Sequence, residues 1–298
     1  MLSGGMLRSV SIIGAGRVGR VLGKRLREVG WRIGAVITRS PATSRAAARA
    51  IGGGTPQAGL TCQALMADVI LLATPDDTLA HVARALARAC GDGCRGKVIL
   101  HTSGALDRNV LGPLERRGAA TGSLHPMQTF SGRGVPKLQG VIFAVEGDPR
   151  ARRIAKKIAR ALGGVPVTMG GSSRKGAYHA AGAFVAGHIL ALTEAATQVL
   201  IKLGFTRRHA VQALLPLARQ MLDNLERLGP QASWTGPIAR GDYATVMKHK
   251  AALRRYPREF QEAYDALAFL SGRVLSKKPG ATLTELKRAL KNSRGGKK

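Results

Sequence analysis

The chain has 298 residues, 45% of them hydrophobic, which is enough for the cores of two domains. Its 47 Lys and Arg residues against 17 Asp and Glu give a net charge of +30, which attracts phosphates, carboxylates and nucleic acids. Aromatic residues make up only 4%, and no helix-turn-helix, zinc-finger or RNA-recognition motif stands out. We therefore assign most of this charge to solvated surfaces and expect no specific nucleic-acid partner.

The cysteines and the hydropathy pattern indicate the cellular compartment of the protein. Cys62, Cys90 and Cys94 are too few and too irregularly spaced for a disulfide framework. Cys90 and Cys94 lack a second pair of ligands, so no metal site is expected. No apolar run approaches the roughly 20 residues of a membrane span, and the first residues do not resemble a signal peptide. These features predict a cytoplasmic protein without a membrane partner.

The stretch around the first glycines predicts a dinucleotide site. An apolar run ends in Gly14-Ala15-Gly16-Arg17-Val18-Gly19, and residues 20–29 follow with helical spacing. In such a turn Gly14 lets the chain leave the strand sharply, Gly16 admits the diphosphate, and Gly19 lets the helix pack closely. The helix N-terminus then offers its free N–H groups to the phosphates. All six residues are therefore candidate cofactor contacts.

Short apolar runs then alternate with helical stretches, which is typical of a parallel sheet covered on both faces. Further strands are expected at 31–37, 68–73, 97–100, 119–124, 141–145 and 165–169, with helices at 44–51, 77–89 and 150–162. From 174 to 203 the sequence predicts one long helix buried on most sides, followed by helices near 206–228, 242–253, 257–270 and 282–290. We predict an α/β Rossmann-type domain in residues 1–170 and an all-helical domain in 171–298, with a basic disordered tail from about 292.

The residues after the second expected strand indicate which dinucleotide binds. A protein that binds NAD usually has Asp or Glu there, for the ribose hydroxyls. This chain has Thr38-Arg39-Ser40. A guanidinium and two hydroxyls favour a 2′-phosphate, so we predict NADP. The alternative is that Arg39 is an ordinary surface arginine.

The carboxyl ends of later strands supply the other candidate contacts. Ligands of open parallel sheets bind outside these ends. Ala73-Thr74-Pro75 and Thr102 follow two of the expected strands. We expect the nicotinamide to lie between the Thr74-Pro75 loop and the Thr102-Ser103 loop.

Four residues are candidates for chemistry beside a nicotinamide. Ser103 could meet a substrate oxygen, although Ser103-Gly104 could also be a simple turn. His125 could donate a proton or bind a carboxylate, or it could be a structural histidine. Lys175 and His179 are four residues apart and share one helix face, where they could polarise a carbonyl or supply a proton. They could also be a basic helix start and a packed histidine.

One loop of the helical part is a candidate for substrate binding. Residues 234–242 contain two glycines, a proline and an Arg240/Asp242 pair. Arg240 could hold an anionic substrate. The stretch could equally connect two helices, with Asp242 as an N-cap.

Taken together, these motifs resemble a specific group of proteins. The chain is similar to predicted oxidoreductases that join a Rossmann-like NADP-binding domain to a helical domain of unknown function. The resemblance is carried by Gly14-x-Gly16-x-x-Gly19, His101-Thr102-Ser103-Gly104, Ser123-Leu124-His125-Pro126-Met127-Gln128-Thr129-Phe130, Tyr178-His179-Ala180-Ala181 and Thr235-Gly236-Pro237-Ile238-Ala239-Arg240-Gly241-Asp242. The group is similar in plan to pyrroline-5-carboxylate reductase, ketopantoate reductase and the 6-phosphogluconate dehydrogenase superfamily.

The resemblance implies NADP binding, a helical domain of the 6-phosphogluconate dehydrogenase C-terminal type, an inter-domain site and a homodimer formed through that domain. In hydroxyacid dehydrogenases of the superfamily a Lys-x-x-x-Asn pair acts on substrate; here the lysine is matched by Lys175, and His179 replaces the asparagine. We expect an oxidoreductase that acts on a small, anionic carbonyl or imine compound. Some relatives are described as deazaflavin-dependent, which we do not carry over. The alternatives are a non-catalytic NADP-binding regulatory or scaffold protein and a basic nucleic-acid-associated protein.

Overall fold

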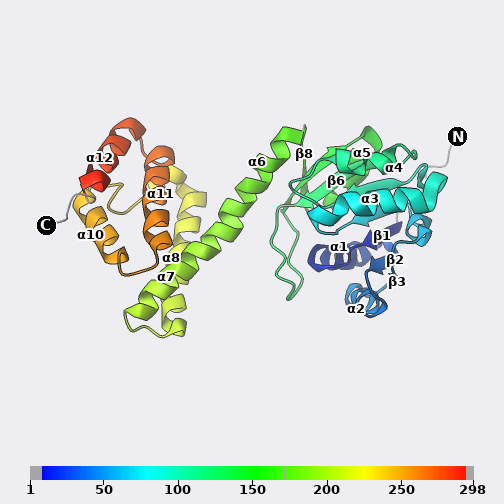
Figure 1. Cartoon of the computed structure of the whole chain (residues 1–298), viewed down its shortest axis with the longest axis horizontal. Coiled ribbons are helices and arrows are strands. Elements are labelled where there is room, and N and C mark those ends of the chain that lie inside the picture. The colour runs from blue at the N-terminus through cyan, green and yellow to red at the C-terminus, as the bar shows by residue number, and fades with distance from the viewer. Residues whose placement is uncertain (1–8, 171, 293–298) are drawn as a thin grey trace. The chain divides into compact units, whose positions relative to one another are not determined.

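The computed structural model describes residues 9–170 and 172–292 (Figure 1). The chain divides into two compact units, with the boundary between Gly187 and His188. The domain boundary at residue 170 remains a prediction, because the helix that begins at Ser172 belongs to the first unit as far as Gly187.

The first unit is built on one eight-stranded sheet with the strand order β3-β2-β1-β4-β5-β6-β7-β8. The strands are β1 (Ser9–Ile13), β2 (Arg32–Thr38), β3 (Thr55–Ala58), β4 (Val69–Leu72), β5 (Val98–His101), β6 (Ala120–Pro126), β7 (Ile142–Gly147) and β8 (Val165–Thr168). All neighbouring strands are parallel except β6 and β7. The expected strands are confirmed. The sequence did not reveal β3, because this edge strand is short, largely exposed and contains Pro56.

Helices cover both faces of the sheet, as the alternating pattern predicts. On one face lie α1 (Arg17–Glu28), α2 (Pro41–Ile51) and α5 (Pro149–Ala161), whose apolar residues pack on the even-numbered side chains of β1 such as Val10 and Ile12. On the other face lie α3 (Asp76–Cys90), α4 (Gly112–Glu115) and the 3₁₀ turns η1 (Cys62–Met66), η2 (Gly91–Cys94) and η3 (Arg108–Leu111). The expected Rossmann-type α/β architecture is confirmed.

The long helix begins in the first unit and continues into the second. It consists of α6 (Ser172–Ala183), one π-helical segment η4 (Phe184–His188) and α7 (Ile189–Lys202). The second unit continues with α8 (Arg207–Leu228), α9 (Pro230–Ser233), α10 (Tyr243–Leu253), α11 (Arg258–Val274) and α12 (Pro279–Asn292). The expected all-helical region is thus confirmed. Of the tail expected from about 292, all but Asn292 lies outside the described residues.

One expectation about the long helix is wrong. The helix is not buried on most sides, since Val185 is 65% and Leu190 70% exposed. The helix Arg174–Lys202 is also long and apolar enough to cross a membrane by length and composition alone. The sequence pattern did not reveal this because the helix has no uninterrupted apolar run and carries small residues and single charges among its apolar ones. Core helices of soluble proteins pass the same test, so the observation is weak evidence for a membrane.

Candidate active site

The turn after β1 has the geometry that a dinucleotide diphosphate requires. Gly14 has φ +86°, and a Cβ there would lie 2.7 Å from Thr74 Cγ2, so only glycine fits. A Cβ at Gly16 would meet no atom within 4 Å, which leaves open space beside the backbone. A Cβ at Gly19 would lie 2.6 Å from the Gly14 carbonyl oxygen. The turn therefore leaves room for a phosphate at the N-terminus of α1, where the first N–H groups lack helical partners.

The residues after β2 form a cluster of hydroxyls at the N-terminus of α2. Ser40 caps the helix by accepting a hydrogen bond from the Thr43 N–H at 3.3 Å. The Thr38 and Thr43 hydroxyl oxygens are 2.6 Å apart, and Arg39 is exposed beside them. No Asp or Glu occurs between Arg32 and Ile51. The cluster therefore presents hydroxyls, a guanidinium and a helix N-terminus, all of which favour an anion.

The loops after β4 and β5 lie at the same edge of the sheet. The Ala73 N–H donates to the Ile13 carbonyl at 2.8 Å, and the Thr102 N–H donates to the Leu72 carbonyl at 3.0 Å. The Thr74 hydroxyl is buried and has no hydrogen-bond partner among the described residues. Pro75 is exposed next to it. These backbone bonds hold the two loops next to the Gly14 turn, as the parallel topology predicts.

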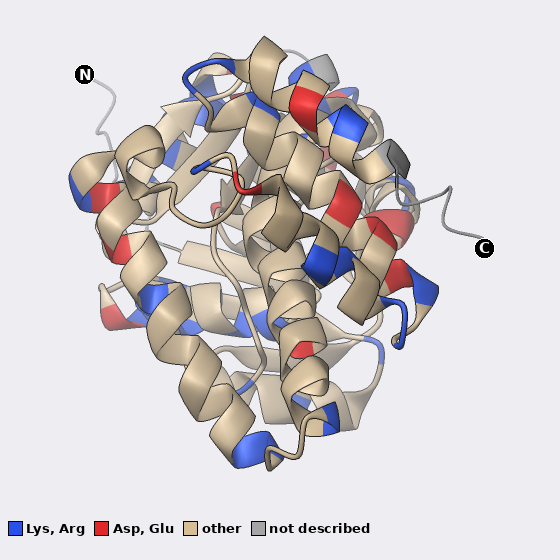
Figure 2. Cartoon of the chain, turned by 90° about the vertical axis from the view of Figure 1, so that its left-hand side faces the viewer, with Lys and Arg blue, Asp and Glu red and all other residues tan. Residues whose placement is uncertain are grey.

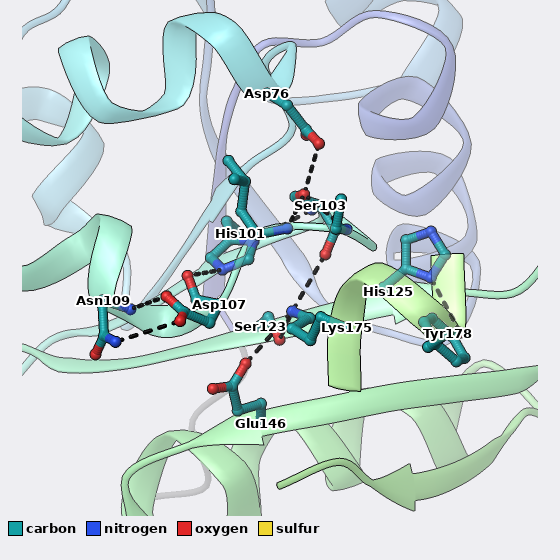
Figure 3. A network of polar contacts seen from close by, with 12 residues as sticks. Asp76, His101, Ser103, Asp107, Asn109, Ser123, His125, Glu146, Lys175 and Tyr178 are labelled. Atoms are coloured by element: carbon teal, nitrogen blue, oxygen red, sulfur yellow. Dashed lines mark hydrogen bonds and ion pairs between the residues drawn. The ribbon is translucent and has the colours of Figure 1, made fainter. Parts of the chain in front are cut away.

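Lys175 is the centre of a buried polar network (Figure 3). Its side chain is 1% exposed, and its Nζ donates to the Ser123 hydroxyl at 2.8 Å and to the Ser103 carbonyl at 3.4 Å. An ion pair of 3.4 Å joins it to Glu146, whose side chain is 13% exposed. The antiparallel pairing of β6 with β7 places Ser123 opposite Glu146 and so builds this site. Burial lowers the pKa of Lys175, and the charge of Glu146 partly opposes that shift.

Ser103 and His101 are also fully engaged by protein partners. The Ser103 hydroxyl donates to Asp76 at 2.8 Å and accepts from the N–H groups of Ala105 and Leu106. His101 is completely buried, with Nε2 3.2 Å from the Asp107 carbonyl and Nδ1 accepting from the Ser103 N–H. These partners require the tautomer with hydrogen on Nε2. Burial lowers the pKa of His101 to about 3, so it is neutral.

His125, Tyr178 and His179 form a second, more accessible cluster. His125 Nδ1 lies 3.1 Å from the Tyr178 hydroxyl, and its ring meets those of Tyr178 and His179 edge-on. A Cβ at Gly104 would lie 2.6 Å from His125 Nε2, so any larger residue there would displace the His125 ring. Burial, followed by the charges of His179 and Lys175, lowers the pKa of His125 to about 4. Burial raises the pKa of Tyr178. Both groups are therefore uncharged at neutral pH.

The structure thus brings together Ser103, His125, Lys175 and His179, the four candidates for chemistry. Sequence reasoning did not single out Asp76, Ser123, Glu146 or Tyr178 as functional residues. Ser123 and Tyr178 lie in motifs that carried the family resemblance, and Asp76 follows a strand end. Glu146 had no sequence signal, because its role depends on the antiparallel register of β7.

Arg240 belongs to the second unit. It is exposed in a turn where its N–H donates to the Gly236 carbonyl at 3.2 Å. Asp242 caps α10 by accepting from the Thr245 N–H at 3.1 Å. Residues 234–242 therefore connect two helices, with Asp242 as the N-cap, which is one of the two alternatives that the sequence left open. A substrate-binding role for Arg240 remains a prediction.

The cysteines form no disulfide among the described residues. Cys62, Cys90 and Cys94 are free thiols. Within the described ranges, no three or more His, Cys, Asp or Glu side chains are grouped so that they could hold a metal ion.

Comparisons with known proteins agree with this fold. Solved structures with the same fold include a candidate NADP oxidoreductase from Bacteroides fragilis (22% identity, TM-score 0.71, covering 87% of this chain and 96% of that one). A reductive aminase from Aspergillus terreus, in complex with NADPH and ethyl-5-oxohexanoate, is 17% identical (TM-score 0.64, 98% and 97% covered). A pyrroline-5-carboxylate reductase from Coxiella burnetii is 18% identical (TM-score 0.55, 95% and 98% covered). No curated protein matches the chain significantly.

Two family descriptions match successive parts of the chain. Residues 5–126 match a Rossmann-like domain, and residues 141–270 match a domain of unknown function, DUF2520. The structural neighbours share this two-part plan at low sequence identity, which establishes the fold. The chain therefore joins a Rossmann-like domain to a DUF2520 domain, as the resemblance of its sequence motifs implied.

Proposed function

We propose that this protein is an NADP(H)-dependent oxidoreductase that transfers hydride to or from a small, anionic carbonyl or imine compound. The observation that carries the proposal is the position of two features at one edge of the sheet. The open glycine turn follows β1, and the His125–Tyr178 pair lies at the end of β6. Similarity in fold to an NADPH-bound reductive aminase and to a pyrroline-5-carboxylate reductase supports the choice of carbonyl and imine substrates.

The choice of NADP rests on the α2 N-terminus. Thr38, Arg39 and Ser40 would hold the 2′-phosphate, since no carboxylate in this segment would repel it. The diphosphate would lie over Gly16, with Arg17 and Val18 at the start of α1, and Gly14, Ala15 and Gly19 shaping the turn. The loops containing Ala73, Thr74, Pro75 and Thr102 would border the nicotinamide. When bound, NADPH supplies a hydride.

The proton for the reduced oxygen or nitrogen would come from the His125–Tyr178 pair. Both groups are neutral near pH 7, and they share a hydrogen bond of 3.1 Å. Tyr178 gives its proton to substrate and becomes a tyrosinate, which the N–H of neutral His125 stabilises through this bond until solvent returns the proton. His179 is exposed beside His125 and would assist in binding the substrate.

The sequence suggests that Lys175 acts directly on the substrate. In this proposal Lys175 instead positions other residues of the site. A side chain that is 1% exposed cannot touch a substrate without moving its surroundings. Its Nζ holds the Ser103 carbonyl and the Ser123 hydroxyl, which belong to the loop after β5 and to β6. We therefore assign Lys175 and Ser103 as positioning residues for His125 and Gly104.

A screen of keto acids, aldehydes and cyclic imines, with NADPH oxidation as the readout, tests the proposal. We expect turnover with at least one of these classes by the wild-type protein. The Gly16→Val variant should fold equally well but lose cofactor binding, because its side chain enters the space left for the diphosphate. If NADPH binds tightly and no substrate class is turned over, the protein is the non-catalytic NADP-binding alternative.

We also propose that the protein forms a homodimer through its helical unit. Large apolar residues are exposed there, including Leu190 at 70%, Leu217 at 68% and Leu203 at 66%. Exposed apolar surface on this scale usually marks an interface. Light scattering should give the mass of a dimer, and Leu190→Glu with Leu217→Glu should give a monomer. A monomeric wild type contradicts this proposal, and pelleting of the wild type with lipid vesicles would assign the surface to a membrane. A cytoplasmic location stays a prediction.

A further inference from the structure

The positive charge of the first unit is concentrated on one face of the sheet. The helices on that face carry thirteen Lys and Arg residues, five on α1, two on α2 and six on α5, and one acidic residue, Glu28. The helical segments on the opposite face, α3, η2, η3 and α4, carry three basic and four acidic residues. In the helical unit, Figure 2 shows acidic and basic residues interspersed. A general bias toward basic residues does not explain this segregation.

Twelve of the thirteen side chains are available to a second ligand, since Arg17 is assigned to the cofactor diphosphate. All are exposed or half-exposed, and within the described part of the chain only Arg25 pairs with a carboxylate, that of Glu28. The α1 and α5 parts of the face are continuous, because one pocket is lined by Arg25 from α1, Lys137 from the β6–β7 loop and Arg160 from α5. Such a field of unpaired charge attracts a polyanion.

We propose that the face formed by α1, α2 and α5 binds the sugar–phosphate backbone of a double-stranded nucleic acid without reading its sequence. Ten of its thirteen basic residues are Arg, which binds phosphate through a bidentate fork. These helices carry no Phe, Tyr or Trp, so the face has no platform for stacking unpaired bases. Single-stranded nucleic acid is therefore a poorer fit than a duplex.

The same face is a poor fit to a membrane. Helices that lie on bilayers insert large apolar side chains between the lipids. The apolar residues of these helices, such as Leu22, Ile51 and Ile158, are directed into the protein core and are at most 1% exposed. The face thus offers charge without an apolar anchor, which suits a duplex backbone.

The test distinguishes binding by this face from binding caused by the net charge of the whole protein. The face variant carries Arg150→Gln, Arg153→Gln, Lys157→Gln and Arg160→Gln, all on α5 and away from the glycine turn. The control variant removes the same charge from the helical unit through Arg208→Gln, Arg219→Gln, Arg227→Gln and Lys287→Gln, which are exposed residues outside its ion pairs. Fluorescence anisotropy measures the affinity of full-length protein for a DNA or RNA duplex of about 25 base pairs between about 50 and 200 mM salt.

We expect the face variant to bind at least tenfold more weakly at low salt. The slope of log K against log salt should fall by about 0.9 for each phosphate that the variant no longer neutralises. The control variant should bind within about twofold of wild type, and both variants should keep the wild-type melting temperature and NADPH affinity. A shorter variant, Arg153→Gln with Lys157→Gln, replaces the face variant if that one unfolds. Equal weakening by both variants, tighter binding to single strands, or binding only to anionic vesicles would overturn the proposal.

Discussion

The Tyr178 hydroxyl lies 3.1 Å from Nδ1 of His125, and the two rings meet at 85°. This bond joins α6 to the end of β6. A second pair, His249 and Tyr264, has almost the same geometry in the helical unit, with 2.9 Å between the atoms and 87° between the rings. The second pair also has a buried lysine next to it, since Lys250 pairs with Asp265 at 2.6 Å. The first pair differs in lying at the carboxyl end of β6, at the edge of the sheet that carries the glycine turn. Its location, rather than its geometry, makes it a candidate for proton transfer.

Replacing Tyr178 by Phe should lower kcat for an identified substrate about 100-fold, because general acid catalysis contributes on the order of 10²–10⁴. The affinity for NADPH should not change, since Tyr178 is assigned no cofactor contact. Steady-state kinetics and a fluorescence titration measure the two quantities. Tyr264→Phe is the matched control and should leave kcat unchanged. Equal activities of the two variants would remove Tyr178 from the proton path.

Replacing Lys175 by Met should destabilise the protein by about 3–5 kcal/mol, because it leaves the Glu146 carboxylate without its partner in a buried site. Urea unfolding measures this loss. The double variant Lys175→Met with Glu146→Gln should recover part of the stability, since both charges are then gone.

The same double variant tests whether Lys175 is a positioning residue. It should keep measurable kcat, with the acid limb of the pH profile moved to higher pH, because the Lys175 charge that helps to lower the pKa of His125 is gone. A complete loss of turnover in the folded double variant would return Lys175 to a direct role in the reaction.

Replacing Arg39 by Ala should raise the Kd for NADPH about tenfold and leave the Kd for NADH unchanged. The reason is that only NADPH carries the 2′-phosphate that a guanidinium binds. Isothermal titration measures both constants. Arg49→Ala, near the end of α2, is the control for charge and should have little effect. Equal affinities for both cofactors in the wild type would contradict the assignment of NADP.

The protein should lose stability as the pH falls from about 6.5 toward 3. His101 has a folded-state pKa of about 3, so below pH 6.5 the unfolded chain binds a proton that the native state does not. Each such histidine changes the unfolding free energy by about 1.4 kcal/mol per pH unit in this range. Between about 6.5 and 4 His125 adds to the effect.

His101→Gln should reduce this dependence, measured by urea unfolding across the pH range. His81→Gln removes an exposed histidine of α3 and should leave the dependence as it is. If the unfolding free energy depends on pH in the same way in both variants, then His101 has the same pKa in the native and the unfolded state.

Much of the first unit could be predicted from the sequence, because each central strand is a continuous apolar run between polar turns. The strands expected at 68–73 and 97–100 agree with β4 and β5 to within one residue at each end. The edge strand β3 has no apolar run, and it forms because β2 offers it a backbone to pair with. The exposure of α7 was also unpredictable, since its composition is that of a core helix.

The site could be predicted only in part, because sequence spacing reports local geometry and not contacts between residues far apart along the chain. Gly14, Gly16 and Gly19 follow from local geometry, which sequence spacing reports well. The burial of Lys175 depends on its partners Ser123 and Glu146, which are 52 and 29 positions away along the chain. Spacing of four residues showed that Lys175 and His179 share a helix face. It could not show that one is buried and the other exposed.

Hydride transfer itself is the most direct test of the account. Wild-type protein is incubated with NADPH that carries deuterium at the transferring position and with each substrate of the carbonyl and imine panel, and the products are analysed by mass spectrometry. The account predicts one deuterium on the former carbonyl or imine carbon of at least one product, and a much lower yield of that product with Tyr178→Phe. Tight NADPH binding without deuterium in any product would contradict it.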